Sequence, residues 1–304
     1  MWRWTGRRTR IVVAEMSDQP AGDQTVRSGF VTLVGRPNVG KSTLVNAICG
    51  RKVSIVSDKP QTTRRQVRGV LTRPGLQIVF VDTPGLHKPV TALGERVNAA
   101  AIESIADVDV ACLLVDATAP FGTGDQWVAS RLDLSKTIVV VNKCDAASRD
   151  AVGEQLARAG LLDAEAYFPV SARTGDGVAA LVEYIAAKLP EGPLYYPEDV
   201  ISDLTDPDWV AELVREQLLA EMRDEIPYSI ATRVTEWEWP RVRCEIIVER
   251  ESQKGMVIGK GGAMVKKVRE RVRRQLPPGI VLELKVKVDK DWQRRPERVQ
   301  QLGY

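Results

Sequence analysis

The stretch Gly35-Arg36-Pro37-Asn38-Val39-Gly40-Lys41-Ser42 fits the phosphate-loop pattern G-x-x-x-x-G-K-[ST]. An apolar, β-branched run at residues 30–34 precedes it, and residues 43–48 are expected to open a helix, which is the context that the motif requires. The glycines allow the backbone to wrap a polyphosphate with several N–H groups pointing inward, beside the positive N-terminus of the helix. Lys41 then supplies a cation for the terminal phosphates, and the Ser42 hydroxyl can ligate Mg²⁺. An accidental glycine-rich turn is the alternative, but the flanking strand and helix favour nucleotide binding.

Composition and charge indicate two parts with different partners. The chain has 304 residues, of which 44% are apolar, so it has room for about two domains that each bury a core. Its net charge is only +3, yet residues 241–304 contain 17 Lys and Arg against 8 Asp and Glu. That segment carries +9 and the remainder −6. A basic end on a mildly acidic body favours nucleic acid or an anionic membrane as its partner.

Several classes of protein are disfavoured by what the sequence lacks. The four cysteines are far apart and form no C-x-x-C pair, which is typical of reduced thiols rather than of a disulfide frame or a zinc site. No apolar run reaches the roughly 18–20 residues of a membrane span. Residues 1–27 lack the apolar core of a secretory signal and are expected to be a disordered extension, with Met16 as an alternative start.

Residues 28–190 alternate apolar strands with helical segments, which predicts a mostly parallel sheet with helices on both faces. The expected strands are residues 30–34, 66–71, 77–81, 108–115, 137–141 and 166–170. Ligands of such a sheet bind outside the carboxyl ends of the strands. The remaining motifs of this domain all lie at those ends.

The strand at residues 77–81 leads into Asp82-Thr83-Pro84-Gly85. An acidic residue at this position can hold Mg²⁺ through water, and the Gly85 N–H can reach a γ-phosphate. Alone, a D-x-x-G pattern is usually just a turn. It gains weight here because it follows the phosphate loop at a distance of about 40 residues.

The next strand, at residues 137–141, leads into Asn142-Lys143-Cys144-Asp145. The carboxylate of Asp145 can accept hydrogen bonds from two donors of guanine, the exocyclic amine and the ring N–H. A base that lacks these donors would leave the carboxylate unpaired. The backbone of Ser171-Ala172-Arg173, after the last strand, can contact the same base. Two ordinary polar loops are the alternative, and the order of the motifs favours guanine over adenine.

Together these motifs resemble the translation-factor-like class of P-loop GTPases, whose first switch corresponds to Gln61-Thr62-Thr63-Arg64. The resemblance implies GTP or GDP with Mg²⁺, and we choose Thr63 over Thr62 as the residue that closes on the metal. The implied metal ligands are Ser42, Thr63 and Asp82, and the implied catalytic residues are Lys41, Thr63, Gly85 and Asn38. The implied nucleotide-binding residues are Gly35, Asn38, Val39, Gly40, Lys41, Ser42, Thr43, Asp82, Gly85, Asn142, Lys143, Asp145, Ser171 and Ala172.

One residue departs from the Ras-like pattern. Leu86 stands where Ras-like GTPases carry a glutamine that orients water, so unaided hydrolysis is expected to be slow. GTPases with an apolar residue at this position form a group, and several of them bind K⁺ beside the phosphates. Asn38 resembles the residue that ligates K⁺ in those proteins. The alternative is that Asn38 only stabilises the loop. His87 follows in the second switch, either as a general base or as a solvent-facing loop residue.

A Pro- and Gly-rich segment, residues 191–207, predicts a stiff linker before a second domain at residues 208–304. An amphipathic helix is expected over residues 209–223 and strands over residues 228–237 and 242–249. The motif Gly259-Lys260-Gly261-Gly262 follows, then a basic helix over residues 263–275 and a half-buried strand over residues 280–288.

This second domain resembles a type II KH domain, a small α+β fold with the order helix–strand–strand–helix–helix–strand. Such domains clamp about four single-stranded nucleotides at a G-x-x-G loop. A glycine turn beside a solvated basic helix is the alternative. The V-I-G-K-G-G sequence, the order of elements and the +9 charge favour RNA. The expected RNA-binding residues are Lys254, Ile258, Gly259, Lys260, Gly261, Gly262, Lys266 and Lys267.

The combination of the two domains resembles the bacterial Era GTPases over residues 28–304. That resemblance implies binding to the 3′ end of 16S ribosomal RNA, a role in maturation of the 30S subunit, and a cytoplasmic protein with peripheral contact to the inner membrane. We expect a monomer that binds no DNA. GTP would order residues 53–65 and 85–90 and thereby change how the KH domain is held.

Three other functions stay open at this point: a switch for a protein or membrane target, a P-loop ATPase or metabolic kinase, and a static RNA-binding module. The motif at residues 142–145 argues against ATP. The presence of Lys41, Ser42 and Asp82 argues against a vestigial nucleotide site.

Overall fold

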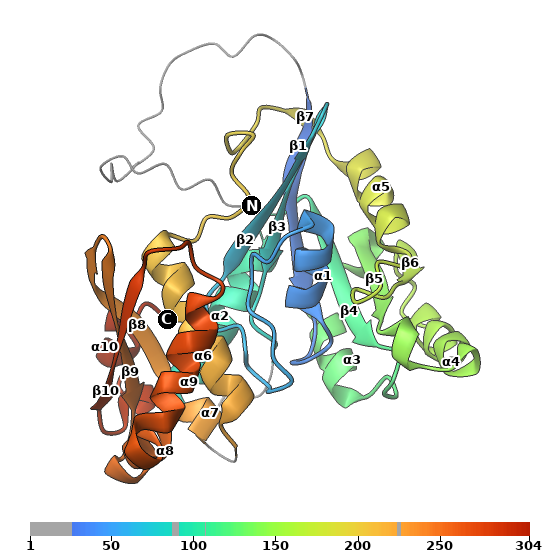
Figure 1. Cartoon of the computed structure of the whole chain (residues 1–304). Coiled ribbons are helices and arrows are strands. Elements are labelled where there is room, and N and C mark those ends of the chain that lie inside the picture. Colours follow the sequence, from blue (N-terminus) through green and yellow to red (C-terminus); the bar gives the residue numbers. More distant parts are fainter. Residues whose placement is uncertain (1–25, 87–90, 107, 224–225) are drawn as a thin grey trace.

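The computed structural model describes residues 26–86, 91–106, 108–223 and 226–304 (Figure 1). The expectations for residues 1–25, for His87 and for the rest of the second switch up to Val90 lie outside the described residues.

The first domain is built on a seven-stranded sheet in the order β2-β3-β1-β4-β5-β6, with β7 pairing beside β1. Strands β3, β1, β4, β5 and β6 run parallel, whereas β2 and β7 are antiparallel to their neighbours. The strands are β1 Val26–Val34, β2 Val67–Arg73, β3 Leu76–Asp82, β4 Val110–Asp116, β5 Thr137–Asn142, β6 Ala166–Pro169 and β7 Glu191–Gly192. The expected mostly parallel sheet is confirmed, with strand ends shifted by a few residues.

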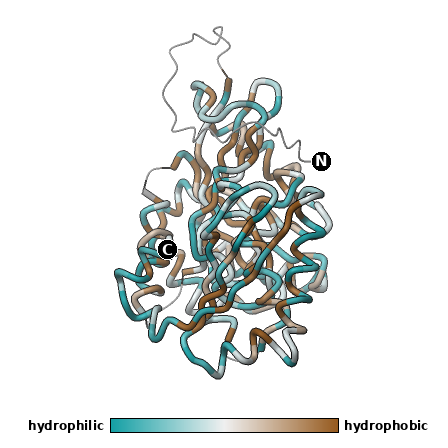
Figure 2. Tube along the Cα trace, turned by 60° about the vertical axis from the view of Figure 1, so that its left-hand side comes forward, coloured by the Kyte–Doolittle hydropathy of each residue, from teal (hydrophilic) through white to brown (hydrophobic). Residues whose placement is uncertain are grey.

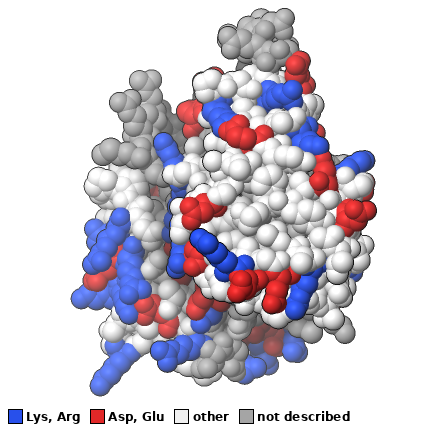
Figure 3. Space-filling model, turned by 90° about the vertical axis from the view of Figure 1, so that its right-hand side faces the viewer, with Lys and Arg blue, Asp and Glu red and all other residues white. Residues whose placement is uncertain are grey.

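Five helices cover the two faces of this sheet: α1 Lys41–Cys49, α2 Ala92–Ala106, α3 Thr123–Ala129, α4 Arg149–Gly160 and α5 Val178–Lys188. Because successive strand residues point to opposite faces, Leu33 packs with α1 and α5, whereas its neighbour Val34 packs with α2, α3 and α4. Apolar segments accordingly run through the interior of the chain trace (Figure 2). In the side view that faces α4 and α5, wide areas carry no charge, and Lys and Arg gather at one edge (Figure 3).

The expected domain boundaries shift where the chain enters and leaves this sheet. Val26 and Arg27, assigned above to a disordered extension, are the first residues of β1, and the Arg27 guanidinium donates to the carbonyls of Ala187 and Leu189 at 3.0 Å each. The segment expected as a stiff linker begins as β7, which pairs with β1. It then continues along the sheet, where the Gln77 side chain bonds the backbone of residues 195 and 196.

The second domain has the element order expected of a type II KH domain. Its sheet has the order β10-β9-β8, with β9 parallel to β10 and antiparallel to β8. The elements are α6 Asp206–Glu221, α7 Ile226–Ser229, β8 Ala231–Glu238, β9 Arg241–Val248, α8 Glu251–Ile258, α9 Ala263–Arg273, β10 Val281–Val288 and α10 Pro296–Gln301. Thr205 caps α6, since its hydroxyl accepts from the Asp208 N–H, and the helix therefore starts three residues earlier than expected.

One expected strand was wrong at its beginning. Residues 228 and 229, placed above in a strand, belong to the short helix α7, and β8 starts only at Ala231. Pro227 has a fixed φ and no N–H, which suits the first turn of a helix and not the interior of a sheet.

The two domains share a buried apolar cluster. Leu93 and Val97 of α2 pack with Ala231, Ile247 and the C-terminal residues Trp292, Val299 and Leu302. Trp292 is fully buried, and its indole N–H donates to the Ser229 carbonyl at 2.9 Å. The helix that follows the D-x-x-G motif therefore packs directly against the second domain. Within the described residues, no helix combines the length and the apolarity needed to cross a bilayer.

Candidate nucleotide and RNA sites

The phosphate loop links the end of β1 to the start of α1. Gly40 has φ +98°, and a Cβ there would lie 2.2 Å from the Asn142 side-chain nitrogen, so both the conformation and the close approach require glycine. Asn38 also has a positive φ, of 64°. The turn of the phosphate loop is thus packed against the last residue of β5.

Lys41 is buried in this loop, and its Nζ donates to the carbonyls of Gly35 at 3.2 Å and Arg36 at 3.0 Å. Burial lowers the pKa of Lys41 to about 8, although the charge of Asp82 opposes the shift. The loop backbone therefore holds the ammonium group in place by hydrogen bonds to neutral carbonyls. Phosphate oxygens would offer it a stronger, charged partner.

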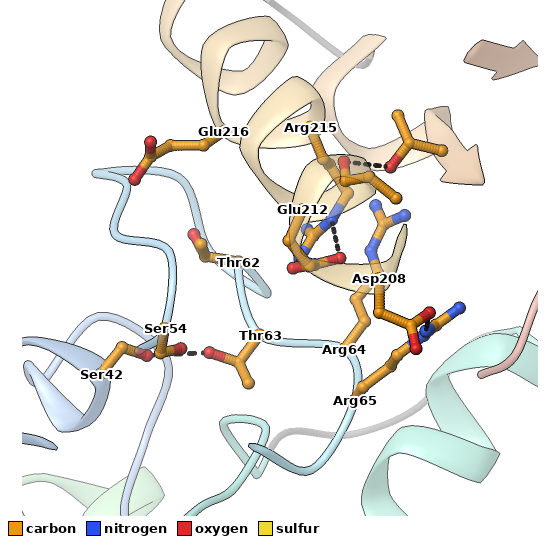
Figure 4. Close-up of polar contacts among 12 residues, drawn as sticks. Ser42, Ser54, Thr62, Thr63, Arg64, Arg65, Asp208, Glu212, Arg215 and Glu216 are labelled. Carbon is orange, nitrogen blue, oxygen red and sulfur yellow. Dashed lines mark hydrogen bonds and ion pairs between the residues drawn. The ribbon is translucent and has the colours of Figure 1, made fainter. Parts of the chain in front are cut away.

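The hydroxyls of Ser42 and Thr63 meet at 2.9 Å, although 21 positions separate them in the chain (Figure 4). The Thr62 hydroxyl instead donates to the Lys59 carbonyl at 2.7 Å. The geometry therefore favours Thr63 over Thr62 as the residue that joins Ser42 at the metal.

Asp82 lies fully buried at the end of β3. Its Oδ2 accepts from the Ser54 hydroxyl at 2.7 Å, and its Oδ1 has no hydrogen-bond partner among the described residues. Burial raises the pKa of Asp82, against the opposing hydrogen bond from Ser54 and the charge of Lys41. An orphaned carboxylate oxygen beside two hydroxyls suits Mg²⁺, which prefers hard oxygen ligands.

Sequence reasoning missed the residues that hold Asp82. Asn46 of α1 accepts from the N–H groups of Val53 and Ser54 at 2.8 and 2.9 Å and donates to the Ser54 carbonyl at 2.8 Å. The Ser54 hydroxyl then binds Asp82. Asn46 is a polar residue in an otherwise apolar stretch of helix, which is the one signal in the sequence; Ser54 carries none.

A cavity of about 400 Å³ opens between the phosphate loop and the first switch. The expected site residues that line it are Asn38, Gly40, Lys41, Ser42, Thr43, Thr63, Gly85 and Lys143. Gly85 lies so close to the loop that a Cβ would be 2.7 Å from the Pro37 backbone. The other expected residues, Gly35, Val39, Asp82, Asn142, Asp145, Ser171 and Ala172, lie behind or beside this cavity and do not line it.

On the base side, Asn142 connects two loops. Its side chain donates to the Val39 carbonyl at 2.9 Å and accepts from the Ala172 N–H at 3.0 Å. Asp145 accepts from the Ser171 hydroxyl at 2.6 Å and pairs with Arg173 at 2.5 Å, and these bonds lower the pKa of Asp145. Asn142 is therefore a bridge that aligns the loops. Asp145 is held in its ionised form, the form that can accept two donors from guanine.

The predictions of slow hydrolysis and of K⁺ binding depend on Leu86 and Asn38, and neighbouring residues hold both of these side chains in place. Leu86 is 2% exposed and belongs to the apolar cluster that α2, α3 and α4 form on the sheet. Its side chain thus faces the core, not the cavity. The Asn38 side-chain nitrogen donates to the Asp58 carbonyl at 2.7 Å, which joins the phosphate loop to the first switch; K⁺ binding stays a prediction.

The first switch is tied to the second domain through a residue that sequence reasoning passed over. Arg64 is 4% exposed and donates to the carbonyls of Ile230 at 2.5 Å, Tyr228 at 2.8 Å and Pro227 at 3.2 Å. These carbonyls belong to α7 and to the residue before β8. Arg64 adjoins Thr63, so the second domain contacts the first switch one residue away from the hydroxyl that meets Ser42.

Two further contacts reinforce this connection. Arg65 pairs with Asp208 of α6 at 2.5 Å (Figure 4), and its other nitrogen donates to the Leu302 carbonyl at 2.7 Å. At the start of the switch, Glu216 of α6 accepts from the Val56 N–H at 3.1 Å. Both ends of the switch are therefore bonded to α6 and its neighbours.

The glycine-rich loop of the second domain connects α8 to α9. Gly259, Gly261 and Gly262 have φ values of +73°, +59° and +80°, and a Cβ on Gly261 or Gly262 would point into open space. The side chains of Lys260 and Lys266 are exposed, as RNA contact requires. Lys267 instead pairs with Glu221 of α6 at 2.6 Å, and Lys254 pairs with Glu251 at 3.5 Å. Two of the expected RNA-binding lysines are thus engaged within the domain.

Comparison with protein-family models identifies both domains. Residues 30–143 match the model described as a 50S ribosome-binding GTPase, and residues 225–293 match the KH domain model.

Curated relatives and solved structures extend the match over nearly the whole chain. The protein is 44% identical to the GTPase Era of Mycobacterium tuberculosis strain H37Rv over 296 residues, which cover 91% of this chain and 98% of the relative. The GTPase Era of Mycobacterium sp. strain KMS is 43% identical over the same length, with 91% and 99% covered.

Two crystal structures have the same two-domain arrangement. One is a variant of Aquifex aeolicus Era bound to GDP and AlF₄⁻, at 37% identity and a TM-score of 0.87. The other is Era in complex with MgGDPNP and nucleotides 1506–1542 of 16S ribosomal RNA, at 38% identity and a TM-score of 0.88. Each alignment covers 92% of this chain and 99% of the solved chain.

Proposed function

The chain belongs to the Era family of GTPases, and we propose that it is a GTP-driven switch that binds the 3′ end of 16S ribosomal RNA through its KH domain and assists maturation of the 30S subunit. The observation that carries this proposal is the contact between Arg64, beside Thr63 in the first switch, and the backbone that leads into the KH sheet. It gives nucleotide state a direct route to the RNA-binding domain.

In the GTPase domain, each expected residue has a distinct task. Lys41 holds the β- and γ-phosphates, and the Gly85 N–H meets the γ-phosphate. Ser42, Thr63 and Asp82 would hold Mg²⁺, which when bound neutralises charge that develops on the phosphate oxygens. Asp145 selects guanine, and Asn142 keeps the phosphate loop aligned with the base loop.

Hydrolysis by the free protein is expected to be slow. With Leu86 turned into the core, no side chain at that position orients the attacking water. A K⁺ ion is the proposed source of the missing positive charge. Asn38 would hold it through its side-chain oxygen, since its side-chain nitrogen donates to the Asp58 carbonyl.

The switch works through the residues around Thr63. When Thr63 closes on a bound triphosphate and its metal, Arg64 must move with it or be held by it, because the two residues are adjacent. The three carbonyls bonded by Arg64 belong to α7 and to the residue before β8, so this movement would alter how the KH domain is held. RNA and GTP must then affect each other's affinity by the same factor.

In the KH domain, the open space around Gly261 and Gly262 lets an RNA backbone approach closely, and exposed Lys260 and Lys266 neutralise its phosphates. These features suit a single-stranded nucleic-acid backbone, and the partner proposed is RNA because the solved relative is bound to 16S ribosomal RNA. That the protein binds no DNA is part of the same proposal. A cytoplasmic monomer is part of the proposal; peripheral membrane contact stays an implication of the family that no contact described here favours.

The test is to measure GTP affinity and turnover with and without RNA of nucleotides 1506–1542, the fragment bound by the solved relative. Gly261→Asp places a carboxylate where phosphates should pass, and Gly261→Asn is the matched neutral control. Asn and Asp tolerate the left-handed conformation of Gly261 similarly, so the two variants differ mainly in charge. We expect the RNA to change GTP affinity or turnover, and only the Asp variant to lose the effect.

A protein that binds GTP normally but ignores this RNA would overturn the proposal. A switch that acts on a protein or on anionic lipid through the basic domain would then be the better explanation.

A further inference from the structure

A second cavity lies in the KH domain, at the opposite end of α9 from the glycine-rich loop. It has a volume of about 280 Å³ and is enclosed by the start of α6, the end of β8 and the turn between α9 and β10. Its apolar lining includes Trp209, Trp237, Pro277 and Ile280. Because α9 has 11 residues, the cavity is about 16 Å from the glycine-rich loop along the helix.

The lining of this cavity suits a flat aromatic ligand. Trp209 and Trp237 are half-buried and pack against the KH core, so their indoles are rigid walls and not mobile surface groups. Successive bases of single-stranded RNA stack on such aromatic side chains. The volume falls just below the roughly 300–1,000 Å³ of drug-sized ligand sites, which fits a single nucleobase better than a larger ligand.

The rim of the cavity carries charge that suits a nucleotide. Arg274 lines it, the neighbouring Arg273 is exposed, and neither arginine forms an ion pair with another residue that the structure describes. Gln275 and Asp206 also line the cavity and can bond the polar edge of a base. Lys52 of the first domain pairs with Glu216 at 2.5 Å, donates to Gln275 at 2.8 Å and lies 5.9 Å from the centre of the Trp209 ring.

We propose that this cavity binds one unpaired nucleobase of an RNA strand that continues past the glycine-rich loop, with the base between the indoles and its phosphate at Arg274. The inference rests on the proposed RNA-binding function and adds a second base-binding site to it. The strand in this site would also meet Lys52, which directly precedes the first switch, so this end of the KH domain would bring RNA close to the GTPase domain.

The direct test is photocrosslinking of the full chain to RNA of nucleotides 1506–1542 that carries 5-iodouridine at unpaired positions. We expect a crosslink to the peptide that contains Trp209 or Trp237. The same RNA without 5-iodouridine is the negative control and should give no crosslink. Free 5-iodouridine monophosphate at the same concentration should not crosslink there. If it does so equally well, the site takes a free nucleotide and the assignment to RNA is wrong.

Affinity measurements supply the second test. Trp209→Leu keeps an apolar side chain on the KH core but removes the stacking surface, and Trp239→Leu is the matched control, since Trp239 is 51% exposed and does not line the cavity. We expect Trp209→Leu to weaken binding of the 37-nucleotide RNA on the order of tenfold, as for loss of one stacked base. Binding of a four-nucleotide RNA, which fills only the glycine-rich loop, should not change.

Arg274→Gln changes an exposed residue, so it tests the same site without risk to the fold. It should weaken the long RNA severalfold and reduce the salt dependence of binding by about one phosphate contact. If both variants bind the long RNA within twofold of wild type and no crosslink maps to the cavity, the inference is wrong while the proposed function stands. If the wild type binds neither RNA, the proposed function itself fails.

Discussion

Ser54→Ala should weaken Mg²⁺ binding without touching a metal ligand. The Ser54 hydroxyl is buried and donates to Asp82 Oδ2 at 2.7 Å, whereas the other carboxylate oxygen is left for the metal site. A hydrogen bond to a charged group contributes about 1.5–3 kcal/mol, and loss of such an outer partner lowers metal affinity about 10- to 100-fold. Without this bond the pKa of Asp82 rises further, because the Ser54 bond now lowers it. Protons then compete with Mg²⁺, and the loss of affinity should be larger at pH 6 than at pH 8.

The assay is the dissociation rate of a fluorescent GDP analogue as a function of Mg²⁺ concentration, with Ser104→Ala as the control. Ser104 is also a buried serine of the first domain, and it bonds Thr32 and the Ala101 carbonyl away from the nucleotide cavity. Only Ser54→Ala should shift the Mg²⁺ midpoint. An unchanged midpoint in a folded Ser54→Ala protein would refute the claim that Ser54 positions Asp82.

Three further predictions test other parts of the argument. Arg64→Gln removes charge-assisted bonds to three carbonyls, two of them buried, so it should weaken the domain contact by about 2–4 kcal/mol. The factor by which RNA changes GTP affinity should then fall close to one. The exposed Arg51→Gln is its control, and an intact RNA effect in Arg64→Gln would exclude this route. Leu86→Gln should lower the melting temperature and not accelerate GTP turnover, because it buries a polar group at a cost of about 1–3 kcal/mol; faster turnover would show that the side chain can reach the cavity. The pKa of Lys41 is about 8 in the nucleotide-free protein, and a bound phosphate favours the charged form of the side chain. GTP affinity should therefore fall as the pH rises above 8, and GTP binding at pH 9 should take up about one proton. Calorimetry in buffers of different ionisation enthalpy measures this uptake, and its absence would contradict the buried position of Lys41.

Much of the fold follows from local pattern. The apolar strands β3 and β5 end in a motif residue, and β1 ends directly before the phosphate loop. A parallel sheet brings such ends to one edge. Element ends were harder to predict. Residues 26 and 27 look like part of a polar extension until their pairing with Leu76 and Gly192 is known. The helical turn at residues 226–229 depends on Pro227 and on carbonyls bonded by Arg64.

The sequence by itself determined the motifs in which neighbours along the chain supply the geometry: the phosphate loop, the D-x-x-G turn, residues 142–145 and the glycine-rich loop. In these, the chemistry is contained in a few consecutive residues and needs only a strand or helix beside it. The sequence determined the choice of Thr63 only in part, because its neighbour Thr62 has an identical side chain.

Only the tertiary structure decided how these motifs are held and connected. Ser54 reaches Asp82 across 28 positions, and Arg64 reaches Pro227, Tyr228 and Ile230 across 163 to 166. No local pattern identifies such pairs, because a buried serine or arginine is specified by the partner that folding brings to it. The connection between the nucleotide cavity and the KH domain is therefore a property of the packed molecule, since each side chain finds its acceptor only once the two domains meet.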